Sequence, residues 1–175
     1  MEIKTIYDVV VYTSALLTIK DALVEAVSKK ADLHGADLIV ADLSGANLYG
    51  ADLRGANLRD AKNTELVLAQ LQFLPETGSF EAWKKCSGGV IVKLLIPEDA
   101  NRSHGSERKC RASKAVVLDI FNGKEGESGG GYGKVYYRKG ETVTPINGFD
   151  EDRWVTCSSG IHFFLTRAEA EAYEL

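Results

Sequence analysis

Hydrophobic and polar positions alternate with a period of five along residues 31–60. The segment divides into six consecutive pentapeptides, ADLHG, ADLIV, ADLSG, ANLYG, ADLRG and ANLRD, with leucine at the centre of each. A period of five fits neither the 3.6-residue period of a helix nor the two-residue period of a strand. It predicts a chain that forms a short flat face and then turns a corner, with leucine and alanine pointing inward. The Asp or Asn and Gly positions suit the corners, because these residues tolerate turn conformations.

These pentapeptides resemble the pentapeptide-repeat proteins. The resemblance implies a right-handed β-helix of square cross-section, with four pentapeptides in each coil. Residues 31–60 would then make one and a half coils, each rising by about one strand spacing of ~4.8 Å. Positions 63, 68 and 73 continue the five-residue spacing of the central leucines. Leu68 and Phe73 are apolar there, whereas Asn63 is polar. Residues 61–75 are therefore either degenerate coils or a helix followed by a linker.

The segment before the repeat predicts a cap for its open end, which a solenoid needs. Residues 3–7 and 9–12 are typical of two short strands. Thr18 followed by Asp21 is typical of a helix N-terminus, and an apolar stripe continues the pattern of a helix over residues 18–29.

Pro75 and Gly78 mark a boundary, so we expect an N-terminal domain over residues 1–75 and a second domain over 76–175. Strands are predicted in the second domain at residues 89–96, 113–121, 135–138, 141–144 and 161–165. Residues 122–133 contain six glycines and predict a flexible surface loop. Thr166 and Glu169 form a capping box that begins a terminal helix through Tyr173. The fold class is mainly β with α: a short right-handed quadrilateral β-helix capped by an N-terminal helix, followed by a small α+β domain.

The second half also carries a resemblance, through the segments GSFEAWKKC, GVIVKLLIPEDANR, RKCRA, YRKGE, GIHFF and EAEAY. It is similar to a domain of unknown function that follows pentapeptide repeats in phage-borne and bacterial proteins. The resemblance spans nearly all of residues 78–173 and implies a two-part, phage-encoded protein. It supplies no activity and no catalytic residues.

Composition excludes several classes of protein. The chain has 21 basic and 25 acidic residues, a net charge of −4, which does not fit a globally basic nucleic-acid binder. Its apolar runs are far shorter than the roughly 20 residues of a membrane span. Three cysteines argue against a disulfide scaffold, and the start MEIKTIYD lacks the pattern of a signal peptide. We therefore expect a cytoplasmic protein that contacts no membrane.

Mimicry of DNA by the repeat is not expected. The mechanism needs a long rod of acidic faces, and the clear repeat would be under ~10 Å tall. One turn of DNA is ~34 Å long, so a single copy would cover less than a third of it. Only end-to-end stacking of copies would lengthen the rod, and nucleic acid is not an expected partner.

The candidate site best supported by the sequence is a cluster of basic residues. Arg102, Arg108, Lys109, Arg111 and Lys114 fall within 13 residues. The planar guanidinium group of arginine can donate two parallel hydrogen bonds to a phosphate or a carboxylate. The cluster therefore predicts an anion site on a loop between strands. In the alternative interpretation these charges are solvated or pair with the acidic residues 150–152 and the acidic tail. The candidate ligand-binding residues are Arg102, Arg108, Lys109, Arg111, Arg138 and His162.

Cysteine and histidine offer weaker alternatives. Cys86, Cys110, Cys157 and His162 are ligand types that zinc prefers, but no two cysteines have the close spacing of a zinc motif. Cys157 or Cys110 could instead pair with His162 or His104 as a nucleophile and base. SGGGYGK departs from both the P-loop and the dinucleotide-binding patterns. The sequence therefore predicts no metal, no cofactor and no catalytic residue.

The segment GIHFFLTRAEAEAY is similar to the strand-then-helix segment of some ADP-ribosyltransferase-like domains. That resemblance implies a rival function, a nucleotide-acting enzyme with Arg138, His162 and either Tyr132 or Tyr136 in a cleft.

The favoured hypothesis is a non-enzymatic binding module. The second domain would bind a nucleotide-like anion or a host protein, and the repeat would serve as a scaffold or as the surface of a homo-oligomer. A purely structural assembly protein, with the open end of the β-helix as its interface, is the third alternative.

Overall fold

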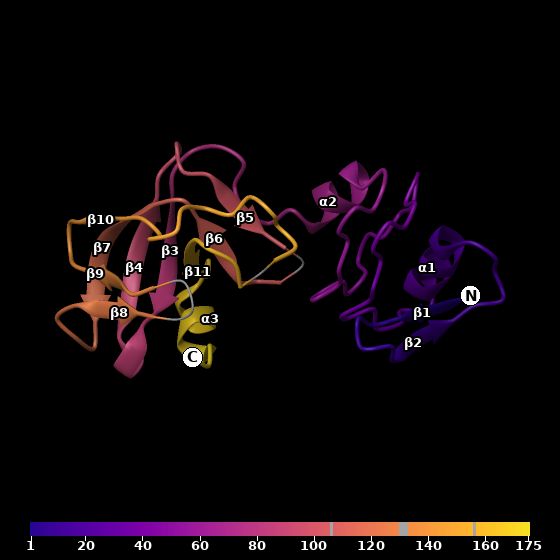
Figure 1. The fold of residues 1–175 in the computed structure, drawn as a ribbon, viewed down its shortest axis with the longest axis horizontal. Coiled ribbons are helices and arrows are strands. Elements are labelled where there is room, and N and C mark those ends of the chain that lie inside the picture. The colour runs from indigo at the N-terminus through magenta and orange to yellow at the C-terminus, as the bar shows by residue number, and fades with distance from the viewer. Residues whose placement is uncertain (106, 130–132, 156) are drawn as a thin grey trace. The chain divides into compact units, whose positions relative to one another are not determined.

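The computed structural model of the chain describes residues 1–105, 107–129, 133–155 and 157–175. The chain divides into two compact units, Met1–Phe73 (unit 1) and Leu74–Leu175 (unit 2). The predicted boundary after residue 75 lies two residues further along the chain. Strands hold more of the described residues than helices do, most of them in unit 2, so the protein is mainly β (Figure 1). Among the described residues, no helix has the length and apolar character needed to cross a lipid bilayer.

Unit 1 begins with an antiparallel hairpin of β1 (Glu2–Lys4) and β2 (Val10–Thr13). Helix α1 (Ile19–Ser28) follows. Its N-terminus is capped by the Thr18 hydroxyl, which accepts a hydrogen bond of 3.1 Å from the backbone N–H of Asp21. The structure thus confirms the two predicted strands and the predicted capped helix.

The pentapeptides of unit 1 bury every central leucine. Within most of them the Asp or Asn side chain accepts a hydrogen bond from the backbone N–H two residues on, which fixes the corner. Parallel bridges join residues 20 positions, or four pentapeptides, apart at Asp32–Asp52, Asp37–Asn57 and Asp42–Lys62. These bridges are isolated, and the repeat does not form a closed solenoid.

A short helix follows the repeat. Helix α2 (Glu65–Leu71) contains Leu68, which continues the five-residue spacing of the central leucines. Of the two alternatives for residues 61–75, the structure therefore shows a helix and a linker, because Asn63 breaks the spacing that a further coil would need.

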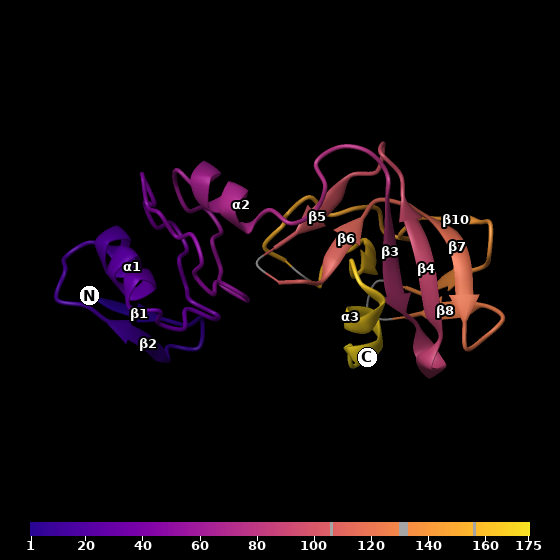
Figure 2. The same cartoon turned by 180° about the vertical axis from the view of Figure 1, so that it is seen from behind.

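Unit 2 contains two main sheets and a separate hairpin, seen from both sides in Figures 1 and 2. The larger sheet has the order β10-β7-β4-β3 and the smaller one β11-β6-β5, while β8 pairs with β9. The elements of the larger sheet are β3 (Phe80–Lys85), β4 (Ile91–Ile96), β7 (Ala115–Phe121) and β10 (Thr142–Val143). The remaining strands are β5 (Arg102–His104), β6 (Cys110–Ala112), β8 (Gly126–Ser128), β9 (Val135–Tyr137) and β11 (Ile161–Phe163). The helical elements are the 3-10 turn η1 (Ser87–Gly89) and α3 (Arg167–Ala172), and α3 begins with the predicted capping box.

Three segments differ from the sequence prediction. No strand was predicted between the boundary at residue 75 and residue 89, yet β3 lies there. The basic segment expected to be a loop contains β5 and β6, and the glycine-rich segment contains β8. Part of the glycine-rich segment, residues 130–132, lies outside the described residues. Strands β5, β6 and β8 have three residues each, which is too short for an alternating pattern to be recognised in the sequence.

Candidate functional site

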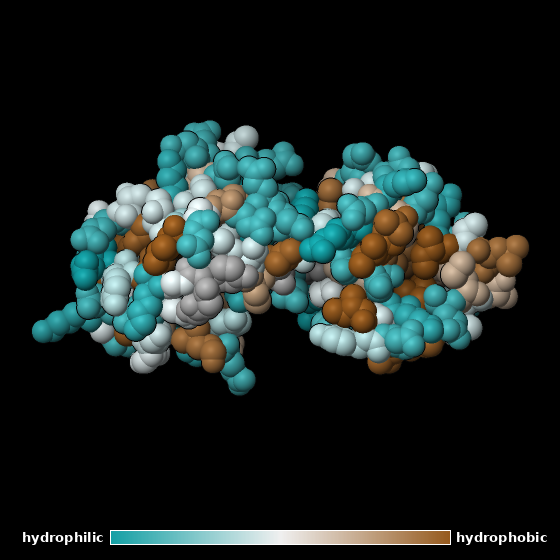
Figure 3. Space-filling model, viewed as in Figure 1, coloured by the Kyte–Doolittle hydropathy of each residue, from teal (hydrophilic) through white to brown (hydrophobic). Residues whose placement is uncertain are grey.

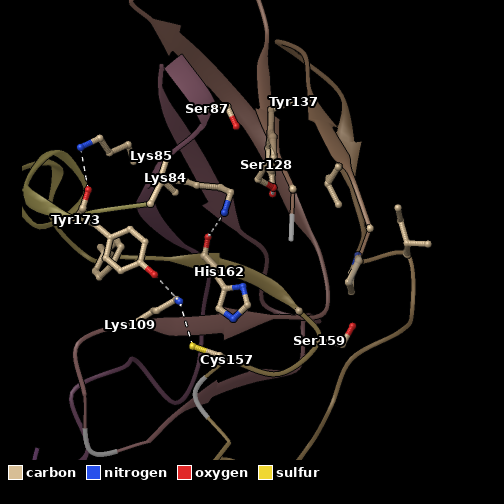
Figure 4. A pocket seen from close by; sticks show the side chains of 18 residues that line it. Lys84, Lys85, Ser87, Lys109, Ser128, Tyr137, Cys157, Ser159, His162 and Tyr173 are labelled. Atoms are coloured by element: carbon tan, nitrogen blue, oxygen red, sulfur yellow. Dashed lines mark hydrogen bonds between the residues drawn. The ribbon is translucent and has the colours of Figure 1, made fainter. Parts of the chain in front are cut away.

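Unit 2 contains a cavity of about 360 Å³. Its walls come from β3, β8, β9, β11 and the segments beside β6 and α3 (Figure 4). The polar or charged side chains of the lining are Lys84, Lys85, Ser87, Lys109, Ser128, Tyr137, Cys157, Ser159, His162 and Tyr173. The described lining contains no Asp or Glu side chain.

Lys84 occupies a position of β3 where the strand pattern calls for an apolar side chain. Alternate residues of the strand face inward, and Ala82 and Lys84 are both buried. The Lys84 side-chain nitrogen Nζ donates a hydrogen bond of 3.2 Å to the backbone carbonyl of His162. It also lies 5.5 Å from the centre of the Tyr137 ring. No carboxylate in the described part of the chain pairs with it, and burial lowers the pKa of Lys84 to about 8.

A backbone pair between the two sheets creates this arrangement. Trp83 and Phe164 exchange hydrogen bonds of 2.8 and 2.7 Å between their N–H and carbonyl groups. This pair ties the end of β11 to the edge strand β3. It places the His162 carbonyl beside Lys84, although the two residues are 78 positions apart in the chain.

Lys109 contributes a second cation to the cavity. Its Nζ donates hydrogen bonds of 2.8 Å to the Tyr173 hydroxyl and 3.5 Å to the Cys157 sulfur. Burial lowers the pKa of Lys109, but the contacts with Tyr173 and Cys157 outweigh burial, so that the pKa lies above its ordinary value. Figure 4 shows the side chains of Lys84, Lys109 and His162 converging on one region of the cavity.

Lys85 has a different role, because its nitrogen is occupied by backbone groups. Its Nζ donates to the carbonyls of Glu171 and Tyr173, at 2.9 and 2.8 Å. A cation at the C-terminal end of a helix satisfies carbonyls that lack partners within the helix. Lys85 therefore fixes the end of α3 and with it the position of Tyr173 at the cavity.

The rest of the lining is mostly apolar, with Val135, Pro145, Ile146 and Phe164 among its members. Burial raises the pKa of the Tyr137 phenol far above its ordinary value, so Tyr137 stays neutral. The cavity therefore combines cationic groups with an apolar wall. Such a site is complementary to an anion that also carries an apolar part.

The structure brings together only Lys109 and His162 of the six sequence-predicted residues. Arg102 instead donates to the backbone carbonyls of Pro75, Gly78, Pro97, Glu98 and Ala100. Arg111 is buried and donates to the carbonyls of Asp150, Asp152 and Ser159. Both guanidinium groups thus tie loops of unit 2 together.

The other predicted residues pair with carboxylates outside the cavity. Arg108 contacts Glu169 at 2.6 Å, and Arg138 contacts Glu125 at 2.9 Å. Lys114 contacts Asp99 at 2.5 Å. Tyr136, one of the two tyrosines of the rival enzyme hypothesis, is exposed and does not line the cavity. The other, Tyr132, lies outside the described residues.

The cysteine and histidine alternatives receive little support from the geometry. Burial raises the pKa of the Cys110 thiol to about 12. Burial also lowers the pKa of the neighbouring His104 to about 4, so neither group is poised for nucleophilic catalysis. Cys157 is exposed, and it lines the cavity with His162. Among the described residues, no three His, Cys, Asp or Glu side chains gather as metal ligands would.

Sequence reasoning missed Lys84 and Lys85 because no strand was predicted between residues 76 and 88. A signal was present in FEAWKK, where Phe80, Ala82 and Lys84 alternate with more polar neighbours. Recognising this strand would have placed a lysine on its inner face.

The chain is thus a mainly β protein in which a pentapeptide array precedes a domain with a cationic cavity. Residues 70–170 match a family described as a family of unknown function (DUF5758), and residues 29–62 match pentapeptide repeats. The first match covers more than half of the chain, so the protein belongs to this family of unknown function and carries pentapeptide repeats before its domain. This confirms the recognition made from the sequence segments. No curated protein and no solved structure matched the chain.

Proposed function

We propose that unit 2 binds a small anionic molecule in the cavity lined by Lys84, Lys109 and His162. The observation that carries the proposal is the buried Lys84 side chain, which has no carboxylate partner in the described part of the chain. Removing an ammonium group from water costs several kcal/mol unless an anion or strong acceptors replace the water. A bound anion would supply that compensation.

The hydrogen bonds of Lys84 leave room for such a ligand. An ammonium group has three donors, and the Lys84 nitrogen uses one of them on the His162 carbonyl. Lys109 adds a second positive charge, and the described lining contains no Asp or Glu side chain that would repel an anion. Charge-assisted hydrogen bonds of this kind are about twice as strong as neutral ones.

The size and walls of the cavity define the class of ligand further. A volume of about 360 Å³ lies at the small end of the range for ligand sites. The apolar wall favours an anion with an apolar or aromatic part, such as a small organic acid or part of a nucleotide.

The test is a binding screen with the full chain. Phosphate, nucleoside monophosphates and small carboxylic acids are compared by thermal shift and then by calorimetry. A ligand at a hundred times its Kd stabilises the folded state by about 2.7 kcal/mol. This should raise the melting temperature of a domain of this size by roughly 10 °C.

Two variants make the screen decisive. Lys84→Met should abolish binding, because it removes the buried cation. Arg138→Gln is the matched control, since Arg138 lies outside the cavity lining, and it should leave the affinity unchanged. Equal binding by the wild type and Lys84→Met, or no binding by any anion of the panel, would overturn the proposal.

We propose for unit 1 a role as the scaffold and oligomerisation surface, with the repeat folded as a short right-handed quadrilateral β-helix. The bridges at Asp32–Asp52, Asp37–Asn57 and Asp42–Lys62 support one coil per four pentapeptides. Apolar side chains gather on the visible face of unit 1 in Figure 3. Tyr7 and Leu17 are two of the large hydrophobic residues of unit 1 that are exposed, at 82% and 90%. Exposed apolar clusters commonly mark contact surfaces.

Sedimentation analysis of the full chain tests this role. We expect a homo-oligomer that dissociates in the double variant Tyr7→Ser, Leu17→Ser. A wild-type protein that stays monomeric at high concentration would refute the oligomerisation surface and leave the proposal for unit 2 untouched.

A further inference from the structure

We propose that the side-chain amine of Lys84 forms a reversible imine with the carbonyl carbon of a small 2-oxo acid held in the cavity. The inference rests on the proposed anion binding and deepens it by naming the ligand class. In this arrangement Lys109 holds the carboxylate of the acid, and Lys84 supplies the nucleophile.

The surroundings of Lys84 suit an amine that reacts. Its side chain is 8% exposed, lines the cavity and lies over the Tyr137 ring. The single hydrogen bond to the His162 carbonyl orients the nitrogen. A neutral amine can donate this bond with one N–H and still direct its lone pair at a carbonyl carbon.

The two cavity lysines differ in charge state, and the difference separates their roles. Burial and, to a smaller extent, the nearby charge of Lys109 together lower the pKa of Lys84 to about 8. The pKa of Lys109 lies above its ordinary value. Near neutral pH a useful fraction of Lys84 is therefore an uncharged nucleophile, while Lys109 stays cationic. Desolvation and a neighbouring cation are the two means by which proteins activate lysine amines.

Lys85 lines the same cavity but is less suited to act as the nucleophilic amine. Its nitrogen is engaged by the carbonyls of Glu171 and Tyr173, so reaction there would release the end of α3. The geometry therefore assigns the reaction to Lys84 alone of the two adjacent lysines.

The proposed step is balanced and needs no co-reactant. The nitrogen lone pair attacks the carbonyl carbon, a C–N bond forms, and proton transfer gives a carbinolamine. The former carbonyl oxygen then leaves as water with the two protons of the neutral amine, so that a neutral C=N bond remains, and this nitrogen can take up one proton from solvent. Hydrolysis reverses the step, and no atom is oxidised or reduced.

Reductive trapping tests the inference. The full chain is incubated at about pH 8 with pyruvate, glyoxylate or 2-oxobutyrate and sodium cyanoborohydride, and the modified peptide is identified by mass spectrometry. We expect one adduct per chain, located on Lys84. Lys84→Arg should abolish the adduct, because a guanidinium group forms no imine, while its positive charge still supports binding of the acid.

Two further variants exclude a general reactivity of lysines. Lys93→Arg is the matched control on the neighbouring strand β4. Lys93 pairs with Glu81 at 2.8 Å and does not line the cavity. This variant should therefore give the same amount of adduct as the wild type. Lys109→Gln should reduce trapping of pyruvate at least tenfold more than it reduces trapping of acetone. Loss of the neighbouring charge raises the pKa of Lys84 and slows both reactions alike, but only pyruvate also loses the group that holds its carboxylate.

The outcomes separate this inference from the proposed function. Adducts spread over exposed lysines, or no adduct with any of the three acids, would overturn the imine. If calorimetry still shows anion binding that depends on Lys84, the proposed function stands without the imine. If no anion binds, both proposals fail together.

Discussion

At the scale of single residues, Lys84 is buried in β3 and has no carboxylate partner in the described part of the chain. A lysine stands where the alternation of β3 calls for an apolar side chain, and the described residues give its ammonium a single backbone acceptor. Residues that reduce stability and have no structural compensation commonly belong to functional sites.

The first prediction follows from the free-energy cost of burying the charged Lys84 side chain. Below about pH 8 both the folded and the unfolded states hold a charged Lys84, so the folded state bears the full cost of burying the charge. Lys84→Met, with similar length and no charge, should stabilise the ligand-free protein at neutral pH by on the order of 1–3 kcal/mol. Thermal unfolding measures this change. Destabilisation of the folded variant would show that Lys84 is a structural residue instead.

The same argument gives a pH dependence for wild-type unit 2 at high pH. The folded pKa of Lys84 is about 8, below the ordinary value of 10.5. Between these values the unfolded state binds more protons, so the contribution of Lys84 to stability should rise with pH across this window. In Lys84→Met this rise should disappear.

His104 gives the second residue-scale prediction. It is 4% exposed, and its Nδ1 lies 3.0 Å from the Gly105 carbonyl. Arg153 approaches its Nε2 at 3.3 Å, so the ring is neutral with the proton on Nδ1. Burial lowers the pKa of His104 to about 4.

Unit 2 should therefore lose stability as the pH falls from about 6.5 to 4. In this window the unfolded state binds a proton that the folded His104 does not, and the full effect is up to about 3 kcal/mol. Melting curves of the wild type and His104→Gln over this range check the prediction. The variant should show a flatter pH profile, and parallel profiles would contradict the assignment to His104.

At the scale of elements, the corners of the repeat set the conformation of the chain. Gly35, Gly45, Gly50 and Gly55 all have positive φ, and Val40 takes the same position with φ of 52°. A β-branched side chain in this left-handed region is strained by about 1–2 kcal/mol.

Val40→Gly should therefore stabilise unit 1 by about 1 kcal/mol, since the side chain is 64% exposed and little packing is lost. Gly50→Val is the reciprocal control. A Cβ at Gly50 meets no atom within 4 Å, so its expected destabilisation comes from the backbone alone. Far-UV circular dichroism on heating measures both, and an unchanged midpoint in either variant would contradict the corner assignment.

At the scale of the whole molecule, the two units can be followed separately. Both tryptophans, Trp83 and Trp154, lie in unit 2. Tryptophan fluorescence therefore reports the unfolding of unit 2, whereas circular dichroism reports both units.

We expect a bound anion to raise the midpoint of the fluorescence transition, and Val40→Gly to leave that midpoint unchanged. The reason is that the ligand contacts unit 2 and the substitution changes unit 1. Equal shifts of the fluorescence midpoint in both experiments would show that the two units unfold as one cooperative structure.

The sequence alone determined the features whose causes are local. The five-residue period places the leucines inside and the Asp, Asn and Gly residues at the corners, and the side-chain hydrogen bonds that fix the corners lie within one pentapeptide. The caps of α1 and α3 could likewise be predicted at Thr18 and Thr166, since a capping hydroxyl bonds to an N–H three residues away. Lys109 and His162 were also found, but only through their residue types.

Only the tertiary structure decided which charges form a site. Arg102 and Arg111 looked like ligand residues, yet they bond to backbone carbonyls that distant loops bring to them. Lys84 lay in a segment with no predicted strand, yet the segment forms the edge strand β3, and the Trp83–Phe164 pair places it beside the end of β11. The cavity depends on contacts between residues far apart in the chain, and their meeting is set by sheet pairing that no local pattern encodes.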